Sequence, residues 1–200
     1  LFLPIGFPHS VDATYLPYQL YDALQGLCSY WRGVVSTRAV LEAAGVGNAS
    51  VTAMSAAMNW ALRDGTGMVG GLVFSYVASS YFDTFVKEFR LFADIINDVA
   101  LTLDMLAPAF GTKHSLWILS LSTICKTMCG MSAGATKGRI THHFARHNGN
   151  MADLTAKEST QETLVSLLGM IGGVLVAQLL EHVPYAVTWI LFGFLTIVHV

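Results

Sequence analysis

Arg63 and Asp64 form a charged pair inside a long apolar region of the sequence. The stretch WALRDGTGMVGGLVF places four glycines directly after this pair, among them Gly65 and Gly67. No other charged residue occurs between residues 43 and 82. Ionisable side chains at membrane depth are costly and usually mark a transport pathway, an ion pair or a gate. The motif is therefore either a substrate or gating site, or a tight turn in which Asp64 accepts hydrogen bonds from the backbone.

A second group of polar residues lies in the stretch EFRLFADIINDVALTLDMLAP. Their spacing puts them on one face of a helix that is otherwise largely apolar. The group consists of Arg90, Asp94, Asn97 and Asp98. Two carboxylates one turn apart could form an acid pair or bind a cation, although hard cations need more oxygen ligands than two. The face is either a proton or substrate relay or a buried polar network that fixes the helix register, and we favour the network.

A third group closes the longest hydrophilic stretch, KGRITHHFARHNGNMADLTAKESTQ. Thr155-x-x-Glu158 and Ser159-x-x-Glu162 both match the capping box that opens a helix, so we expect a helix to begin near them. The polar side chains are denser than capping requires, which predicts a surface for a partner or a substrate. Its members are Asp153, Lys157, Glu158, Ser159 and Gln161.

The histidines of the same stretch could indicate a metal site. His143 and His147 have the i, i+4 spacing of metal ligands, with His142 and Asp153 nearby. They lack a second firm pair of ligands, so we interpret them as solvated residues and predict no metal and no cofactor. The sequence contains no nucleotide-binding loop and no nucleophile–base set, which predicts a protein that is not an enzyme.

The composition is typical of a membrane protein. Of the 200 residues, 54% are hydrophobic and 12% are charged, against about 25% charged in typical soluble domains. The formal net charge of −2 gives no electrostatic basis for binding nucleic acid. The three cysteines show no zinc-binding spacing. We therefore expect the lipid bilayer to be the first partner of this protein.

Helices must position these polar groups. We expect an extended lead-in over residues 1–16 and a single helical membrane domain over residues 17–200. The predicted helices cover residues 18–44, 50–62, 68–80, 91–107, 116–135, 164–180 and 185–200. The fold class is all-α, a polytopic membrane bundle of about six or seven apolar helices with Gly-rich breaks. Because the sequence starts without Met and stops inside an apolar run, we expect a fragment of a longer chain.

Residues 50–80 allow two arrangements. At about 1.5 Å per residue, each flank of the Arg63–Asp64 pair is shorter than the roughly 30 Å hydrocarbon core of a bilayer. Either one tilted, broken helix spans the membrane, or two short spans meet at a polar tip. We favour two spans, because a hairpin tip costs less than Arg63 buried in mid-bilayer. Asn48-Ala-Ser50 matches a glycosylation sequon, and we interpret it as a helix N-cap.

Five motifs resemble one protein family. They are LPIGFPHSV, LPYQLYDALQG, WALRDGTGMVGGLVF, EFRLFADIINDVALTLDMLAP and HHFARHNGNMADLTAKESTQETLVSLLG. They run in this order through most of the chain, which resembles the root UVB sensitive (RUS) family. The resemblance implies a helical protein that is integral to a membrane or tightly associated with one, in plastids or endomembranes. It also implies links to ultraviolet-B responses, vitamin B6 homeostasis and auxin transport, and it supplies no catalytic residues.

Two functions fit these observations. Polar faces on apolar helices, together with glycine breaks, form the paths of membrane transporters. The first function is therefore a non-enzymatic, carrier-like membrane protein that handles a small polar metabolite. The alternative is a membrane scaffold that acts through protein partners, as a homo- or hetero-oligomer with another family member.

The uncharged runs 164–180 and 183–200 predict that the protein partitions with membranes. Washing the membranes with carbonate or high salt removes peripheral proteins and should leave this one in the pellet. Recovery as a soluble monomer without detergent would contradict the membrane interpretation.

Overall fold

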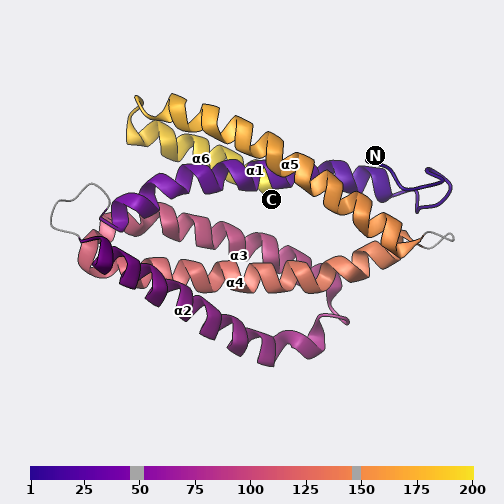
Figure 1. The fold of residues 1–200 in the computed structure, drawn as a ribbon, viewed down its shortest axis with the longest axis horizontal. Coiled ribbons are helices and arrows are strands. Elements are labelled where there is room, and N and C mark those ends of the chain that lie inside the picture. Colours follow the sequence, from indigo (N-terminus) through magenta and orange to yellow (C-terminus); the bar gives the residue numbers. More distant parts are fainter. Residues whose placement is uncertain (46–51, 146–149) are drawn as a thin grey trace. The chain divides into compact units, whose positions relative to one another are not determined.

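The protein is helical over most of its length. The computed structural model describes residues 1–45, 52–145 and 150–200. The described part contains six α-helices and two short 3₁₀ helices (Figure 1). They are α1 (Tyr15–Ala43), α2 (Ala53–Ala78), η1 (Ser79–Tyr81), α3 (Val86–Leu106), η2 (Ala107–Phe110), α4 (Gly111–Phe144), α5 (Met151–Leu180) and α6 (Tyr185–His199). The predicted all-α class is confirmed.

The chain divides into two compact units. The terminal unit consists of residues 1–32 and 137–200, and the central unit consists of residues 33–136. The division falls inside α1 and α4, so both helices contribute to both units. The single domain expected over residues 17–200 stays a prediction.

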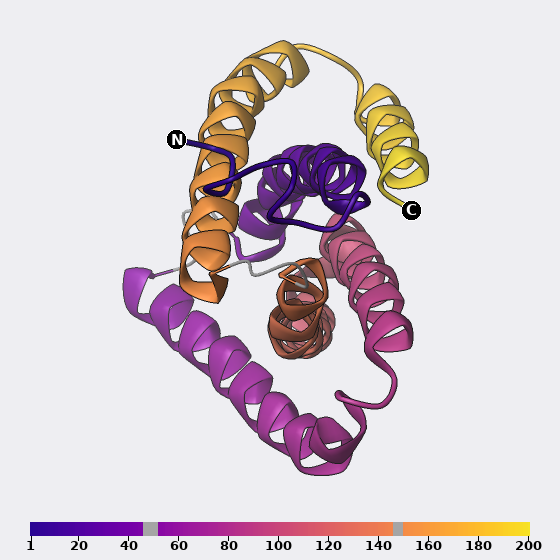
Figure 2. The same ribbon diagram turned by 90° about the vertical axis from the view of Figure 1, so that its right-hand side faces the viewer.

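In the terminal unit, α1 lies between α5 and α6 (Figure 2). Towards α5, the ring of Tyr30 lies directly against Gly169, where a Cβ would be 2.8 Å from the Tyr30 Cγ. The indole Nε1 of Trp31 donates a hydrogen bond to the Gly169 carbonyl at 3.1 Å. Towards α6, Gln25 donates to the His199 carbonyl at 3.2 Å. Small residues on α5 therefore let two large aromatic side chains of α1 approach its backbone.

In the central unit, α4 lies between α2 and α3 (Figure 2). Ser122 of α4 donates a hydrogen bond to the Ala100 carbonyl of α3 at 2.9 Å. On the other side, Gly67 of α2 is so close to α4 that a Cβ would lie 2.6 Å from Cγ2 of Thr123. Glycine in the middle of a helix costs about 1 kcal/mol relative to alanine. Here it permits a close contact between two helices.

The break predicted at Arg63–Asp64 is wrong, because α2 is one continuous helix of 26 residues. The preferred arrangement of two short spans, and the alternative of a capped turn at Asp64, are both wrong for the same reason. The helix begins one turn later than expected, and its N-cap is Thr52, whose side chain accepts a hydrogen bond from the Ser55 amide. The sequon Asn48-Ala-Ser50 lies outside the described residues.

The hydrophilic stretch 137–161 is also mostly helical, contrary to prediction. Helix α4 continues to Phe144, and α5 begins at Met151 rather than near Thr155 or Ser159. The side chain of Asn150 caps α5 by accepting a hydrogen bond from the Ala152 amide at 3.0 Å. Some of the polar side chains of this stretch, such as Glu158, contact other helices of the terminal unit. This packing favours a helix over a loop.

Among the residues that the structure describes, two helices are long enough and apolar enough to cross a membrane. The segments are His114–Phe144 and Met151–Leu180. Only 17% of the most apolar window of the second segment is buried, and its exposed side chains include Leu167, Ile171 and Leu175. A core helix of a soluble protein would bury far more of such a stretch.

Gly67→Ala and Gly65→Ala form a matched pair on α2. A Cβ at Gly67 meets the stiff, β-branched Thr123, whereas nothing lies within 4 Å of a Cβ at Gly65. We expect Gly67→Ala to lower the free energy of unfolding by about 1–3 kcal/mol through overpacking. Gly65→Ala should raise it by up to about 1 kcal/mol, because alanine favours the helix. Thermal unfolding in detergent measures both, and equal stability would contradict the tight α2–α4 contact.

Candidate functional site

Glu158 joins three helices of the terminal unit. It lies in the second turn of α5, and only 5% of it is exposed. Its Oε2 accepts a hydrogen bond from the Thr141 hydroxyl of α4 at 2.7 Å, and its Oε1 accepts one from the Gln19 amide of α1 at 3.2 Å. A buried carboxylate is costly unless such donors satisfy it. Glu158 belongs to the group predicted to form a surface for a partner or a substrate, and the structure buries it.

Gln161 lies one turn further along α5 and is tied to the start of the chain. Its Nε2 donates hydrogen bonds to the Phe2 carbonyl and to the Tyr15 hydroxyl, the second at 3.3 Å. These two bonds use both hydrogens of the amide. Its Oε1 is buried and has no hydrogen-bond partner among the described residues. Buried acceptors are normally satisfied, so this oxygen is an exception among the described residues of the terminal unit.

The lead-in, whose non-helical part ends at Thr14, is anchored on the same helix. Asp153 of α5 accepts a hydrogen bond from the Ile5 amide at 2.8 Å. The fully buried Tyr15 contacts the Phe144 ring edge-on, with centroids 5.4 Å apart. This burial raises the pKa of the Tyr15 hydroxyl, which keeps it neutral. The lead-in is therefore a fixed part of the terminal unit.

A cavity of about 300 Å³ lies beside this network, between α1 and α5. Tyr30, Ala23 and Gly26 supply part of its α1 wall. Its polar lining consists of Gln19, Asp22, Gln161, Glu162 and Ser166. Ligand sites are typically cavities of about 300–1,000 Å³ with a few polar groups in an apolar wall. The cavity therefore has the size and the lining of a site for one small molecule.

The remaining members of this predicted group lie around the network. Lys157 lies 3.9 Å from Asp153, one turn away on α5. Ser159 is exposed. Of the five residues, Gln161 lines the cavity and Glu158 positions one of its walls by binding Gln19.

Arg63 and Asp64 lie in the central unit, and their opposite charges neutralise each other. The Arg63 guanidinium lies over the Trp60 ring, 4.0 Å from its centroid, and Nη2 contacts the Asp64 carboxylate at 2.9 Å. Gly65 lies beside the pair without a close neighbour, and Gly67 packs on α4. The motif thus forms a salt bridge and a helix contact on α2.

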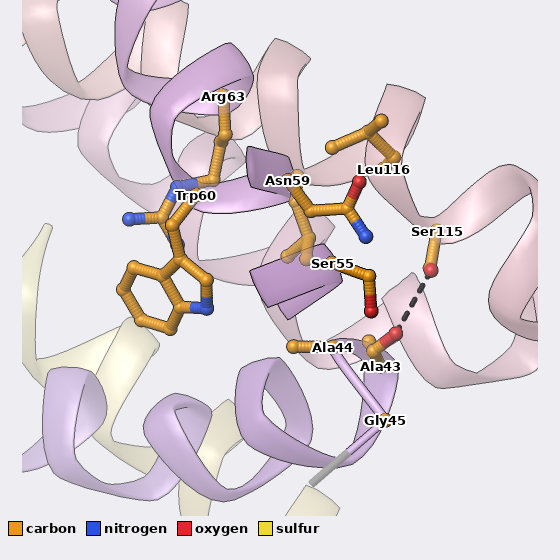
Figure 3. Close-up of a pocket in the computed structure, with 10 residues that line it drawn as sticks. Ala43, Ala44, Gly45, Ser55, Asn59, Trp60, Arg63, Ser115 and Leu116 are labelled. Atoms are coloured by element: carbon orange, nitrogen blue, oxygen red, sulfur yellow. Dashed lines mark hydrogen bonds between the residues drawn. The ribbon is translucent and has the colours of Figure 1, made fainter. Parts of the chain in front are cut away.

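A smaller cavity of about 110 Å³ lies next to Arg63 in the central unit. Figure 3 shows Arg63 folded over Trp60, while the Asn59 amide points the other way. Ser115 forms part of the cavity wall, and its hydroxyl donates a hydrogen bond to the Ala43 carbonyl at 2.9 Å. This cavity holds little more than a few water molecules, so we place the main candidate site in the terminal unit.

The polar face of α3 points towards α4. Arg90, Asp94 and Asp98 all act electrostatically on the Cys129 thiol of α4. These three residues and Asn97 are half-buried. The structure therefore brings the predicted face together within the central unit, where it lies along a helix contact.

The sequence analysis missed an ion pair between a buried aspartate and a half-exposed lysine in the same helix contact. Asp104 of α3 is 2% exposed and pairs with Lys126 of α4. The only sequence signal for this pair is that Lys126 interrupts an otherwise apolar helix. The pair joins α3 to α4 and compensates the charge of the buried Asp104.

The histidines form no metal-binding cluster in the described part of the chain. His142 and His143 are exposed at the end of α4, and His147 lies outside the described residues. No group of three His, Cys, Asp or Glu residues that could bind a metal occurs among the residues that the structure describes.

The described residues form an all-helical protein that has two helices long and apolar enough to cross a membrane and a cavity of about 300 Å³. A family model described as "Vitamin B6 photo-protection and homoeostasis domain" matches residues 1–200. The chain therefore belongs to the root UVB sensitive family. The family is linked to vitamin B6 homoeostasis and, through the names of its members, to UVB sensitivity.

Relatives match along nearly the whole chain. The chain is 40% identical over 200 residues to "RUS family member 1" of Dictyostelium discoideum, covering 100% of this chain and 38% of that protein. It is 40% identical over 198 residues to "Protein root UVB sensitive 3" of Arabidopsis thaliana, covering 99% and 44%. "Protein root UVB sensitive 2, chloroplastic" of Arabidopsis thaliana is 32% identical over 177 residues, with 88% and 40% covered. The chain thus spans less than half the length of these relatives, and no solved structure matches it.

Glu158→Ala and Glu162→Ala compare two carboxylates one turn apart on α5. Removing Glu158 leaves the Gln19 amide without this acceptor and the Thr141 hydroxyl with only the Lys137 carbonyl, which should lower the free energy of unfolding by about 1–3 kcal/mol. Glu162 forms an exposed pair with Lys137, and such pairs contribute about 0–1 kcal/mol. Thermal unfolding of both variants measures the difference. A Glu158 variant as stable as the Glu162 variant would show that the network does not hold the helices together.

Proposed function

We propose that this chain is the membrane-embedded binding region of a carrier for a small, polar compound of the vitamin B6 group, and that it acts without catalysing a reaction. The main support is the cavity between α1 and α5, whose wall includes Gln161 with a buried Oε1 that no described residue satisfies. The family description supplies the class of compound. A planar ring with several hydroxyl or amine groups can form hydrogen bonds with the polar residues of this wall, among them Gln19, Glu162 and Ser166.

The size and shape of the cavity support a single-ring ligand. Its volume of about 300 Å³ is at the lower end of typical ligand sites. The Tyr30 ring in its wall can stack against a planar heterocycle. Polar groups at one end of the ring would meet Gln161 and Ser166.

The position of the cavity along α5 fits a membrane protein. The first part of α5 is polar up to Glu162, and the rest, from Leu164, is largely apolar and exposed. If this apolar part spans the bilayer, the cavity lies where α5 leaves the hydrocarbon core. A polar compound would reach a site at this level from water.

A scaffold role is the second candidate, and one face of α2 favours it. Large apolar side chains on this helix are exposed, with Met54 at 72% and Tyr76 at 90%. Contiguous exposed apolar surface of this kind marks contact with a membrane or with another protein. Another copy of this chain or another family member would be the expected partner.

Ala23→Leu and Ala177→Leu make the same change inside and outside the cavity. Ala23 lines the cavity on α1, and Ala177 is exposed on α5. We expect Ala23→Leu to weaken the binding of pyridoxine at least about tenfold by filling the cavity, and Ala177→Leu to leave it unchanged. Isothermal titration of the protein in lipid nanodiscs measures both, and thermal unfolding verifies that both variants fold. Unchanged binding in Ala23→Leu, or no binding by the unaltered protein, would overturn this proposal and favour the scaffold.

A further inference from the structure

The Thr141 hydroxyl has two hydrogen-bond acceptors within reach. Its Oγ1 lies 2.7 Å from Oε2 of Glu158 and 3.0 Å from the carbonyl oxygen of Lys137, which is one turn earlier on α4. A hydroxyl group has one hydrogen, which rotates to suit its surroundings, and its oxygen can also accept hydrogen bonds. The Thr141 hydrogen can therefore point to Glu158 or to Lys137 while the heavier atoms stay in place.

This arrangement satisfies Glu158 in both of its charge states. When the carboxyl is ionised, Thr141 donates to Oε2 and the Gln19 amide donates to Oε1. When a proton binds Oε2, the carboxyl donates to the Thr141 oxygen, and the Thr141 hydrogen turns to the Lys137 carbonyl. The bond from Gln19 to Oε1 is unaffected. The contact among α1, α4 and α5 is therefore kept in either state.

The surroundings of Glu158 favour its neutral form. Burial raises the pKa of this carboxyl above its ordinary value, whereas the Thr141 hydrogen bond and the Lys137 ammonium lower it. Glu162 of α5 and Asp22 of α1 add to the increase in pKa. Lys137 pairs with Glu162 at 2.6 Å, and both hydrogen bonds to Glu158 come from uncharged groups. A proton therefore binds here more readily than at an exposed glutamate.

We propose that Glu158 is a proton-binding site, which takes up one proton from the solvent and releases it again while α1, α4 and α5 stay in contact. One O–H bond forms at Oε2, and the carboxylate charge is neutralised. Thr141 is the positioning residue, because its hydroxyl reverses direction when the proton binds. Carboxyl groups inside helical membrane proteins often belong to proton relays. The proposal is independent of the proposed function, since no ligand of the cavity enters it.

Infrared difference spectroscopy of the protein in lipid nanodiscs follows this proton directly, because a protonated carboxyl and a carboxylate absorb separately. We expect a carboxylic acid band that titrates at a higher pH than exposed glutamates do. Glu158→Gln imitates the protonated carboxyl, so this variant should fold and lose the band. Glu162→Gln changes the exposed carboxylate one turn away and should keep it. The proposal is overturned if the band is absent at every pH or survives in Glu158→Gln.

Thr141→Val and Thr141→Ser test the role of the hydroxyl. Valine has nearly the shape of threonine but cannot donate to the carboxylate, whose charge-assisted bond is stronger than the bond of the neutral form. We expect Thr141→Val to increase the proton affinity of Glu158 about tenfold, which moves the midpoint of the band up by about one pH unit. Thr141→Ser should restore the original midpoint. Equal midpoints in the two variants would show that the Thr141 hydroxyl does not take part, whereas a loss of stability alone would not move the midpoint.

The free energy of unfolding gives a second measurement. Because the folded protein binds the proton more readily than the unfolded chain, the stabilisation is complete below the pKa of an unfolded glutamate and is lost as the pH rises through the folded pKa. The unaltered protein should therefore lose stability over this range relative to Glu158→Gln. The same pH dependence in both would contradict proton binding at Glu158. If the band titrates but pyridoxine does not bind, the proposed function fails and this inference stands.

Discussion

The geometry of the terminal unit depends on one buried carboxylate. Glu158 sits in α5 and accepts hydrogen bonds from Thr141 of α4 and Gln19 of α1. A carboxylate taken out of water is tolerated only when such donors replace its hydration. The three helices must therefore meet in one register. That register places Gln161 one turn further on against the lead-in and sets the α5 wall of the cavity.

Glycine allows helices to approach closely in both units. In the terminal unit Gly169 lies under the ring of Tyr30, and in the central unit Gly67 lies against Thr123. Small residues at helix crossings are the usual route to association in membranes, where burial of apolar surface gives little driving force between helices. The glycines that suggested breaks thus serve as contact points.

Charged side chains have different kinds of partner in the two units. In the central unit Arg63 is neutralised by Asp64 and covered by Trp60, and Asp104 is paired with Lys126. The first pair lies within α2, whereas the second joins α3 to α4. In the terminal unit the buried Glu158 is held by neutral donors instead, the Thr141 hydroxyl and the Gln19 amide.

The sequence by itself determined the all-α class and the positions of most helices, because apolar periodicity is a local signal. Only the tertiary structure decided that α2 continues through Arg63 and that residues 137–144 are helical. It also decided that Gln19 forms part of the α1 wall of the cavity, opposite α5. Glycine and polar residues disfavour a helix by about 1 kcal/mol at most, and packing against a neighbouring helix outweighs that. The bond from Gln19 to Glu158 joins residues 139 positions apart, which no local pattern can indicate.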